Sequence, residues 1–148
     1  MPNSQHVWMG RIKAVEREFE AAHFAIDWVL NIVQSDPTVL EGKLRPNDIR
    51  IAREQMEATY MVRLFAEFET ALRDYWATKK VTHPPVRDLL ESLAGSRSVS
   101  KDALKNAHAV REFRNALVHE RQDAPDAISL AQARHHLCTF VSFLPRKW

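Results

Sequence analysis

The fold is decided by a stretch in the middle of the chain, Leu64-Phe-Ala-Glu-Phe-Glu-Thr-Ala-Leu-Arg73, whose apolar residues recur at steps of three and four. This spacing is typical of an α-helix that buries one face. The pattern begins at Pro46 and continues to Trp76, after which Thr82-His83-Pro84-Pro85 closes the helix. Its predicted apolar face consists of Ile49, Met56, Tyr60, Leu64, Phe68, Leu72 and Trp76.

A helix of similar length is predicted before it, from about Ser4 to Gln34, with Ser4 as the N-cap. Asp36-Pro37 ends this helix, and a loop from Asp36 to Arg45 leads into the next one. Two long helices joined by a short loop are expected to pair as a hairpin. The predicted apolar face of the first helix consists of Trp8, Ile12, Val15, Phe19, Ala22, Ile26, Val29 and Val33.

Shorter helices are predicted after the long pair. The first runs from Pro85 to about Ala94 and ends at Gly95, a residue that suits the C-terminal end of a helix. A serine-rich turn at residues 96–100 follows, and Ser100 caps the next helix. The apolar stripe of that helix consists of Leu104, Ala107, Val110, Phe113 and Leu117.

The last predicted helix follows a polar loop from Arg121 to Ala127. Ser129 and Gln132 fit a capping box, and the helix is expected to run to Leu144 and stop at Pro145. No stretch shows the period-two alternation of a strand. We therefore expect an all-α protein, an antiparallel four-helix bundle with one extra short helix.

The composition is that of an ordinary globular domain, with 45% hydrophobic and 27% charged residues. A formal net charge of +2 permits a polyanionic partner without requiring one. The single cysteine, Cys138, excludes an internal disulfide. The chain begins without a signal-peptide pattern and contains no apolar run long enough to cross a membrane, so we expect a cytoplasmic protein.

A homodimer is expected from the large apolar side chains. Trp8, Trp28, Trp76 and Phe68 supply more apolar bulk than one small bundle needs for its own core.

The functional interpretation depends on the segment Arg111-Glu-Phe-Arg-Asn-Ala-Leu-Val-His-Glu120. Its Arg114, Asn115 and His119 place a cation, an amide and an imidazole within two helical turns, the groups needed to bind a phosphate and move a proton. An arginine and a histidine at this spacing alone are expected by chance in this composition. The asparagine directly after the arginine makes the match rare.

A structural interpretation of the same residues is also open. Arg114 could pair with a surface carboxylate, Asn115 could be solvated, and His119 could complement the C-terminal end of its helix. His108 lies on the stripe of Glu112 and His119, where it either extends a site or forms a helical pair with Glu112.

Arg114-Asn115-Ala116-Leu117-Val118-His119 resembles the Arg-x4–6-His motif of the HEPN superfamily, the higher eukaryotes and prokaryotes nucleotide-binding domains. The stretch around Glu69 resembles the family segment in which an acidic residue points towards the motif. The resemblance covers residues 46–144 within a single HEPN-like domain spanning residues 1–148.

The resemblance implies a metal-independent endoribonuclease that cleaves RNA by attack of a 2′-hydroxyl on the adjacent phosphorus. Arg114, Asn115 and His119 would be catalytic, with Glu69 supporting them. It further implies RNA as substrate, a homodimer whose motifs meet, and a toxin–antitoxin or antiviral setting with an antitoxin or nucleotidyltransferase partner. No metal or other cofactor is expected.

Basic side chains near the motif are candidates for binding RNA, namely Arg73, Arg111 and Arg121, although a solvated basic rim would look the same in sequence. Two other functions stay open. The chain could be a non-catalytic HEPN-like module that binds RNA, a nucleotide or a protein, or a helical adaptor whose motif stabilises a dimer.

Overall fold

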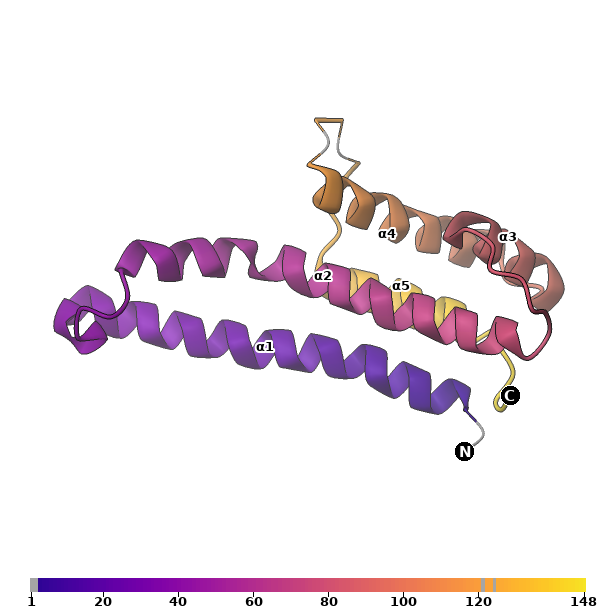
Figure 1. Ribbon diagram of the computed structural model, residues 1–148, viewed down its shortest axis with the longest axis horizontal. Coiled ribbons are helices and arrows are strands. Elements are labelled where there is room, and N and C mark those ends of the chain that lie inside the picture. Colours follow the sequence, from indigo (N-terminus) through magenta and orange to yellow (C-terminus); the bar gives the residue numbers. More distant parts are fainter. Residues whose placement is uncertain (1–2, 121, 124) are drawn as a thin grey trace.

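The computed structural model describes residues 3–120, 122–123 and 125–148 and consists of α-helices joined by short connections (Figure 1). Among the described residues there is no strand, only an isolated antiparallel bridge between Ser4 and Lys147. The expectation of an all-α protein is therefore confirmed. The elements are α1 (Gln5–Ser35), the 3-10 turn η1 (Pro37–Leu40), α2 (Pro46–Ala77), α3 (Val86–Arg97), α4 (Lys101–His119) and α5 (Leu130–Val141).

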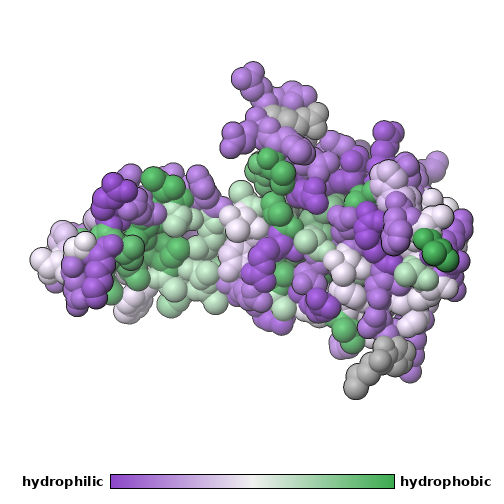
Figure 2. All heavy atoms as spheres, in the orientation of Figure 1, coloured by the Kyte–Doolittle hydropathy of each residue, from purple (hydrophilic) through white to green (hydrophobic). Residues whose placement is uncertain are grey.

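The helices α1 and α2 form a long antiparallel hairpin, and the other helices pack on one half of it (Figure 1). The helix α5 contacts α1, α2 and α4, and α3 contacts α4, which gives a bundle-like arrangement. The free half of the hairpin, residues 20–56, extends beyond the bundle, and we call it the hairpin arm. Apolar side chains are exposed on the arm in the view of Figure 2.

The core forms where the apolar faces of all five helices meet. Phe68 of α2 packs edge-to-face against Phe140 of α5, with the ring centroids 5.7 Å apart. The apolar faces predicted for the two long helices are buried or half-buried, as expected. The largest fully buried side chains are Phe65, Phe68, Phe140, Ile12, Met61, Leu64, Leu72, Leu89, Leu90, Leu93, Leu130 and Leu137.

The starts of α1, α4 and α5 were predictable because each has a local side-chain hydrogen bond. Ser4 accepts from the backbone N–H of Val7, and Ser100 accepts from that of Ala103. Ser129 and Gln132 form the reciprocal capping box. These contacts confirm the three predicted N-caps.

Helix ends were less predictable, and two expectations were wrong. The helix α3 continues through Gly95 to Arg97, and Ser98 adopts the left-handed conformation with φ 51° instead. Arg97 donates to the carbonyl of Phe143, 3.1 Å away, which holds this extra turn in place. The tertiary contact outweighs the preference of glycine for a helix end.

The last helix ends at Val141 and not at Leu144. The reason is Gln5 of α1, whose side-chain amide donates to the carbonyls of Val141, Ser142 and Leu144 at 3.2, 2.7 and 2.9 Å. These carbonyls are satisfied from another helix, so the chain can turn there without leaving them unpaired.

Three of the four large side chains behind the dimer expectation have partners within this chain. Trp8 and Phe68 are buried, and the indole of Trp76 donates to the carbonyl of Thr82 at 3.0 Å. Trp28 alone of the four is largely exposed, at 61%. Of these four side chains, only Trp28 on the hairpin arm is therefore left for a partner.

Asp74 of α2 joins both ends of the chain to the bundle. Its carboxylate accepts from Asn3 Nδ2 at 2.8 Å, from Trp8 Nε1 at 3.1 Å and from Trp148 Nε1 at 2.7 Å. We predict that Asp74→Ala lowers the free energy of unfolding by about 2–4 kcal/mol, because three donors lose a charged acceptor.

Urea denaturation followed by circular dichroism would measure this change. Asp88→Ala, an exposed acidic residue in the first turn of α3, is the control and should cost less than about 1 kcal/mol. Equal losses for the two variants would contradict the role given to Asp74.

Candidate functional site

Arg114 lies on the side of α4 that faces α2. Its side chain is only 26% exposed, and its guanidinium carbon lies 5.0 Å from the ring centroid of Phe65, a fully buried residue of α2. The arginine therefore lies over the aromatic core with its charged end at the edge of the helix contact.

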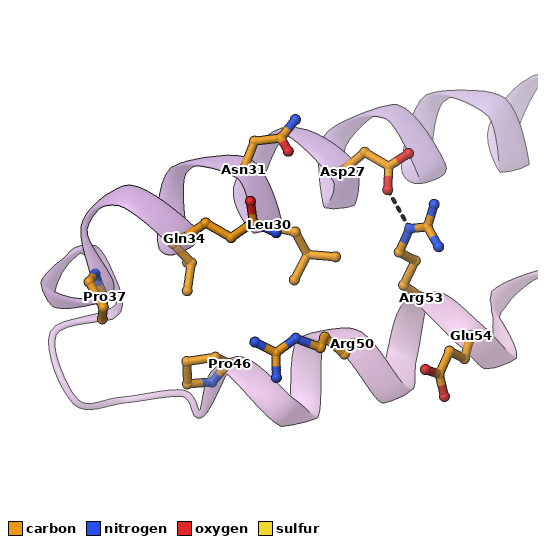
Figure 3. A pocket seen from close by; sticks show the side chains of 10 residues that line it. Asp27, Leu30, Asn31, Gln34, Pro37, Pro46, Arg50, Arg53 and Glu54 are labelled. Carbon is orange, nitrogen blue, oxygen red and sulfur yellow. Dashed lines mark hydrogen bonds and ion pairs between the residues drawn. The ribbon is translucent and has the colours of Figure 1, made fainter.

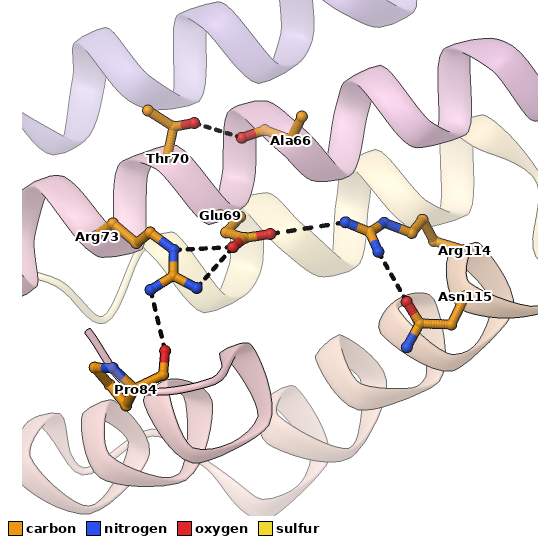
Figure 4. A network of polar contacts seen from close by, with 7 residues as sticks. All are labelled: Ala66, Glu69, Thr70, Arg73, Pro84, Arg114 and Asn115. Carbon is orange, nitrogen blue, oxygen red and sulfur yellow. Dashed lines mark hydrogen bonds and ion pairs between the residues drawn. The ribbon is translucent and has the colours of Figure 1, made fainter. Parts of the chain in front are cut away.

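Glu69 of α2 lies between two guanidinium groups (Figure 4). Its Oε1 accepts from Arg73 Nε at 2.9 Å and lies 2.8 Å from Arg73 Nη2, while its Oε2 lies 3.7 Å from Arg114 Nη2. Arg73 also donates to the carbonyl of Pro84 at 3.1 Å, which fixes its position. The carboxylate is thus oriented by Arg73 and directed at Arg114.

Asn115 extends this network. Arg114 Nη1 donates to Asn115 Oδ1 at 2.8 Å, so the two adjacent side chains of the motif are joined directly. The separation of 3.7 Å between Arg114 and Glu69 is an ion pair and exceeds ordinary hydrogen-bond distances. Arg114 therefore keeps donor capacity that Glu69 does not use.

His119 lies apart from the network. It is the last residue of α4, it is exposed, and no polar contact of its imidazole occurs among the described residues. Glu120 follows in the left-handed conformation, with φ 47°, and its N–H donates to the carbonyl of Ala116, which closes the helix. The imidazole is one helical turn beyond Asn115 and is accessible to solvent.

The other basic residues of the prediction have mixed outcomes. Arg73 and Arg114 share Glu69, whereas Arg111 is mostly buried and pairs with its neighbour Glu112. Arg121 lies outside the described residues. Among the described residues, Arg73 and Arg114 therefore meet at Glu69, and the basic side chains form no continuous rim.

His108 pairs with a residue that the sequence did not suggest. Its Nε2 lies 2.8 Å from Glu91 Oε1 of α3, where a helical pair with Glu112 was the alternative expectation. This contact ties α3 to α4.

A cleft of about 810 Å³ lies between α1 and α2 near the tip of the hairpin arm (Figure 3). Asp27 and Arg53 form an ion pair across it, and the hydrogen bond from Arg53 lowers the pKa of the Asp27 carboxyl. No pattern in the sequence indicated this cleft, because residues of both helices line it. None of the motif residues lines it.

The described residues include no cluster of metal ligands, and the cysteine is buried. Within the described ranges, no cluster of three or more His, Cys, Asp or Glu side chains suits a metal ion. Burial raises the pKa of the Cys138 thiol, which lies in the core at 5% exposure. Cys138 is therefore a packing residue and a poor nucleophile at neutral pH.

Comparisons of the chain with protein-family models, with curated proteins and with solved structures found no match. Within the part of the chain that the structure describes, no helix combines the length and apolar character of a membrane crossing. Any assignment of function therefore depends on the residues around Arg114.

We predict that Glu69→Ala lowers the free energy of unfolding by about 1–3 kcal/mol, because it leaves the guanidinium groups of Arg73 and Arg114 without their shared carboxylate. Thermal and urea unfolding would measure the loss. Glu54→Ala, an exposed acidic residue on the same helix, serves as the control and should change stability by less than about 0.5 kcal/mol.

A double-mutant cycle with Arg114→Ala makes the test specific. If Glu69 acts through Arg114, the two losses are not additive. Additive losses would show that the 3.7 Å ion pair contributes nothing to stability.

Proposed function

We propose that this chain is a metal-independent endoribonuclease of the HEPN type that cleaves RNA by 2′-hydroxyl transesterification. One observation carries the proposal. Arg114 is positioned by Glu69 and Asn115 at the contact between α2 and α4, with the exposed His119 one turn further along the same helix.

The reaction requires three chemical tasks that these side chains suit. A base removes the proton of the 2′-hydroxyl while its oxygen bonds to the adjacent phosphorus. The bond from phosphorus to the 5′-oxygen breaks, an acid protonates that oxygen, and a 2′,3′-cyclic phosphate remains. An imidazole can serve as base or acid near neutral pH, and a guanidinium can stabilise the added negative charge on the phosphoryl oxygens.

In this proposal Arg114 holds the phosphoryl oxygens and His119 transfers the proton. Asn115 keeps the guanidinium aligned through its 2.8 Å contact, and Glu69 fixes the side of Arg114 that faces α2. Arg73 acts indirectly, because its contacts with Glu69 and Pro84 orient the carboxylate of Glu69. A partly buried arginine with few free rotamers is well suited to bind a phosphate in one orientation.

One chain supplies one motif histidine, whereas the mechanism uses both a base and an acid. The proposal therefore includes a dimer in which the motif surfaces of two copies meet, so that one His119 acts as base and the other as acid. A toxin–antitoxin or antiviral setting, with an antitoxin or nucleotidyltransferase as partner, is part of this proposal and has the family resemblance as its support.

A non-catalytic binding module is the second candidate, and Glu69 favours it. The carboxylate lies 3.7 Å from the Arg114 guanidinium and reduces the local positive charge that a phosphate would meet. The net charge of +2 also predicts weak non-specific attraction to RNA. Such a module would bind RNA, a nucleotide or a protein without producing cyclic phosphate ends.

We predict that the wild-type protein cleaves mixed RNA in EDTA and leaves 2′,3′-cyclic phosphate ends. Arg114→Ala and His119→Ala should each reduce the rate at least about 100-fold, because each removes a group that acts in the transition state. Labelled RNA and analysis of the product ends would measure the effect. Lys105→Ala, an exposed basic residue on the same helix, should cleave at the wild-type rate.

The dependence of the cleavage rate on pH distinguishes a mechanism with one catalytic histidine from a mechanism with two. A base and an acid acting together predict a bell-shaped profile, whereas a single titrating group predicts one limb. Binding of RNA without cyclic ends would favour the binding module. Cleavage retained by both His119→Ala and Arg114→Ala would rule out the proposed site.

A further inference from the structure

The outward face of α1 exposes large apolar side chains. Val7, Phe24, Trp28 and Ile32 are 50%, 69%, 61% and 39% exposed. At about 100° per residue these four positions fall within one arc of the helix, on the side away from Trp8, Ile12 and Val15 in the core. The rings of Phe24 and Trp28 lie 6.3 Å apart, so they form one continuous apolar surface.

Apart from Arg17, the remaining positions of this face between Val7 and Ile32 are small. Gly10, Ala14, Ala21 and Ala25 fall within the same arc. Gly10 lies inside the helix, where glycine is less favourable than alanine, yet a Cβ placed there would meet no atom within 4 Å. The packing within one chain therefore gives no reason for a glycine at this position.

The small and large positions are arranged symmetrically about the middle of α1. If a second copy of the helix runs in the opposite direction with its centre also near Phe19, Trp28 of one copy lies opposite Gly10 of the other. Phe24 then lies opposite Ala14, and Ile32 lies within one residue of Val7. Each bulky side chain meets a position where the facing backbone can approach closely.

The charges on this face fit the same arrangement. Arg17 and Glu20 are exposed, and neither makes an ion pair with another described residue. In the reversed pair, Arg17 of one copy lies opposite Ala21 of the other and thus next to its Glu20. The two-fold symmetry creates this contact twice, so the surface is complementary to itself in charge as well as in shape.

We propose that two copies of this chain associate through the outward faces of their α1 helices, antiparallel, over residues 7–32. The overlap is about 38 Å long. The helix α4 lies across α2 and α5 from this face, so the pairing leaves Arg114 and His119 uncovered (Figure 1). This association is therefore separate from the meeting of motifs that the proposed function includes.

Sedimentation velocity and light scattering over about 1–200 μM protein test the pairing, at the micromolar affinities typical of modest interfaces. The mass of the wild type should rise with concentration above that of Trp28→Glu, which keeps only the association made through the motif surfaces. Ile51→Glu is the matched control, since Ile51 is also exposed on the hairpin arm, at 44%, but belongs to α2. It should associate like the wild type.

Two further variants test the geometry. Gly10→Gln raises the helix propensity of α1, and its side chain blocks the close approach of the second copy. It should therefore raise the dissociation constant at least about 10-fold without loss of helicity. Arg17→Glu and Glu20→Arg should each weaken the dimer, and the double variant should restore it.

A wild type that stays monomeric up to 200 μM, or a Trp28→Glu protein with an unchanged mass, would overturn the proposal. A double charge variant that fails to recover would overturn the antiparallel register. His119→Ala should associate like the wild type although it loses RNA cleavage. Failure of the proposed function can therefore be told apart from failure of the α1 pairing.

Discussion

The structure depends on the burial of one face of α2. Phe65, Phe68 and Leu72 are fully buried, and α2 contacts α1, α4 and α5 along this face. Since Glu69 directly follows Phe68, the packing of that phenylalanine sets where the carboxylate emerges. The same register places Phe65 under the guanidinium of Arg114. The polar network is therefore a consequence of the core, and a shift of α2 by one residue would remove it.

This origin explains the balance of charge at Arg114. A guanidinium that lies over an aromatic ring and is only 26% exposed needs a nearby negative group, and Glu69 supplies it. Arg73 supplies a second positive charge, so the three side chains together carry a net charge of +1. The arrangement holds Arg114 in place, which favours catalysis, and reduces its attraction for phosphate, which favours binding without catalysis.

The two long helices have different roles along their length. At the end of the hairpin where the two termini lie, polar contacts hold α1 and α2 to the rest of the bundle. These contacts involve Asp74, Gln5 and the N-cap Ser4. Further along, the hairpin arm extends beyond the bundle, and its Phe24 and Trp28 are exposed. The proposed pairing surface and the proposed RNA site lie on different sides of the bundle. A protein with both could associate without obstructing its own motif.

The sequence by itself determined the helices, their starts and the position of Arg114, Asn115 and His119 at the end of α4, because periodicity and N-caps are local properties. It did not determine where α3 and α5 end, since Arg97 and Gln5 reach carbonyls far away in the chain. Nor did it determine that the hairpin arm extends beyond the bundle and exposes Phe24 and Trp28. The contact of Glu69 with Arg114 joins residues 45 positions apart and exists only because α2 and α4 pack together. Tertiary packing decided these features, because only it brings distant donors, acceptors and apolar faces within reach of one another.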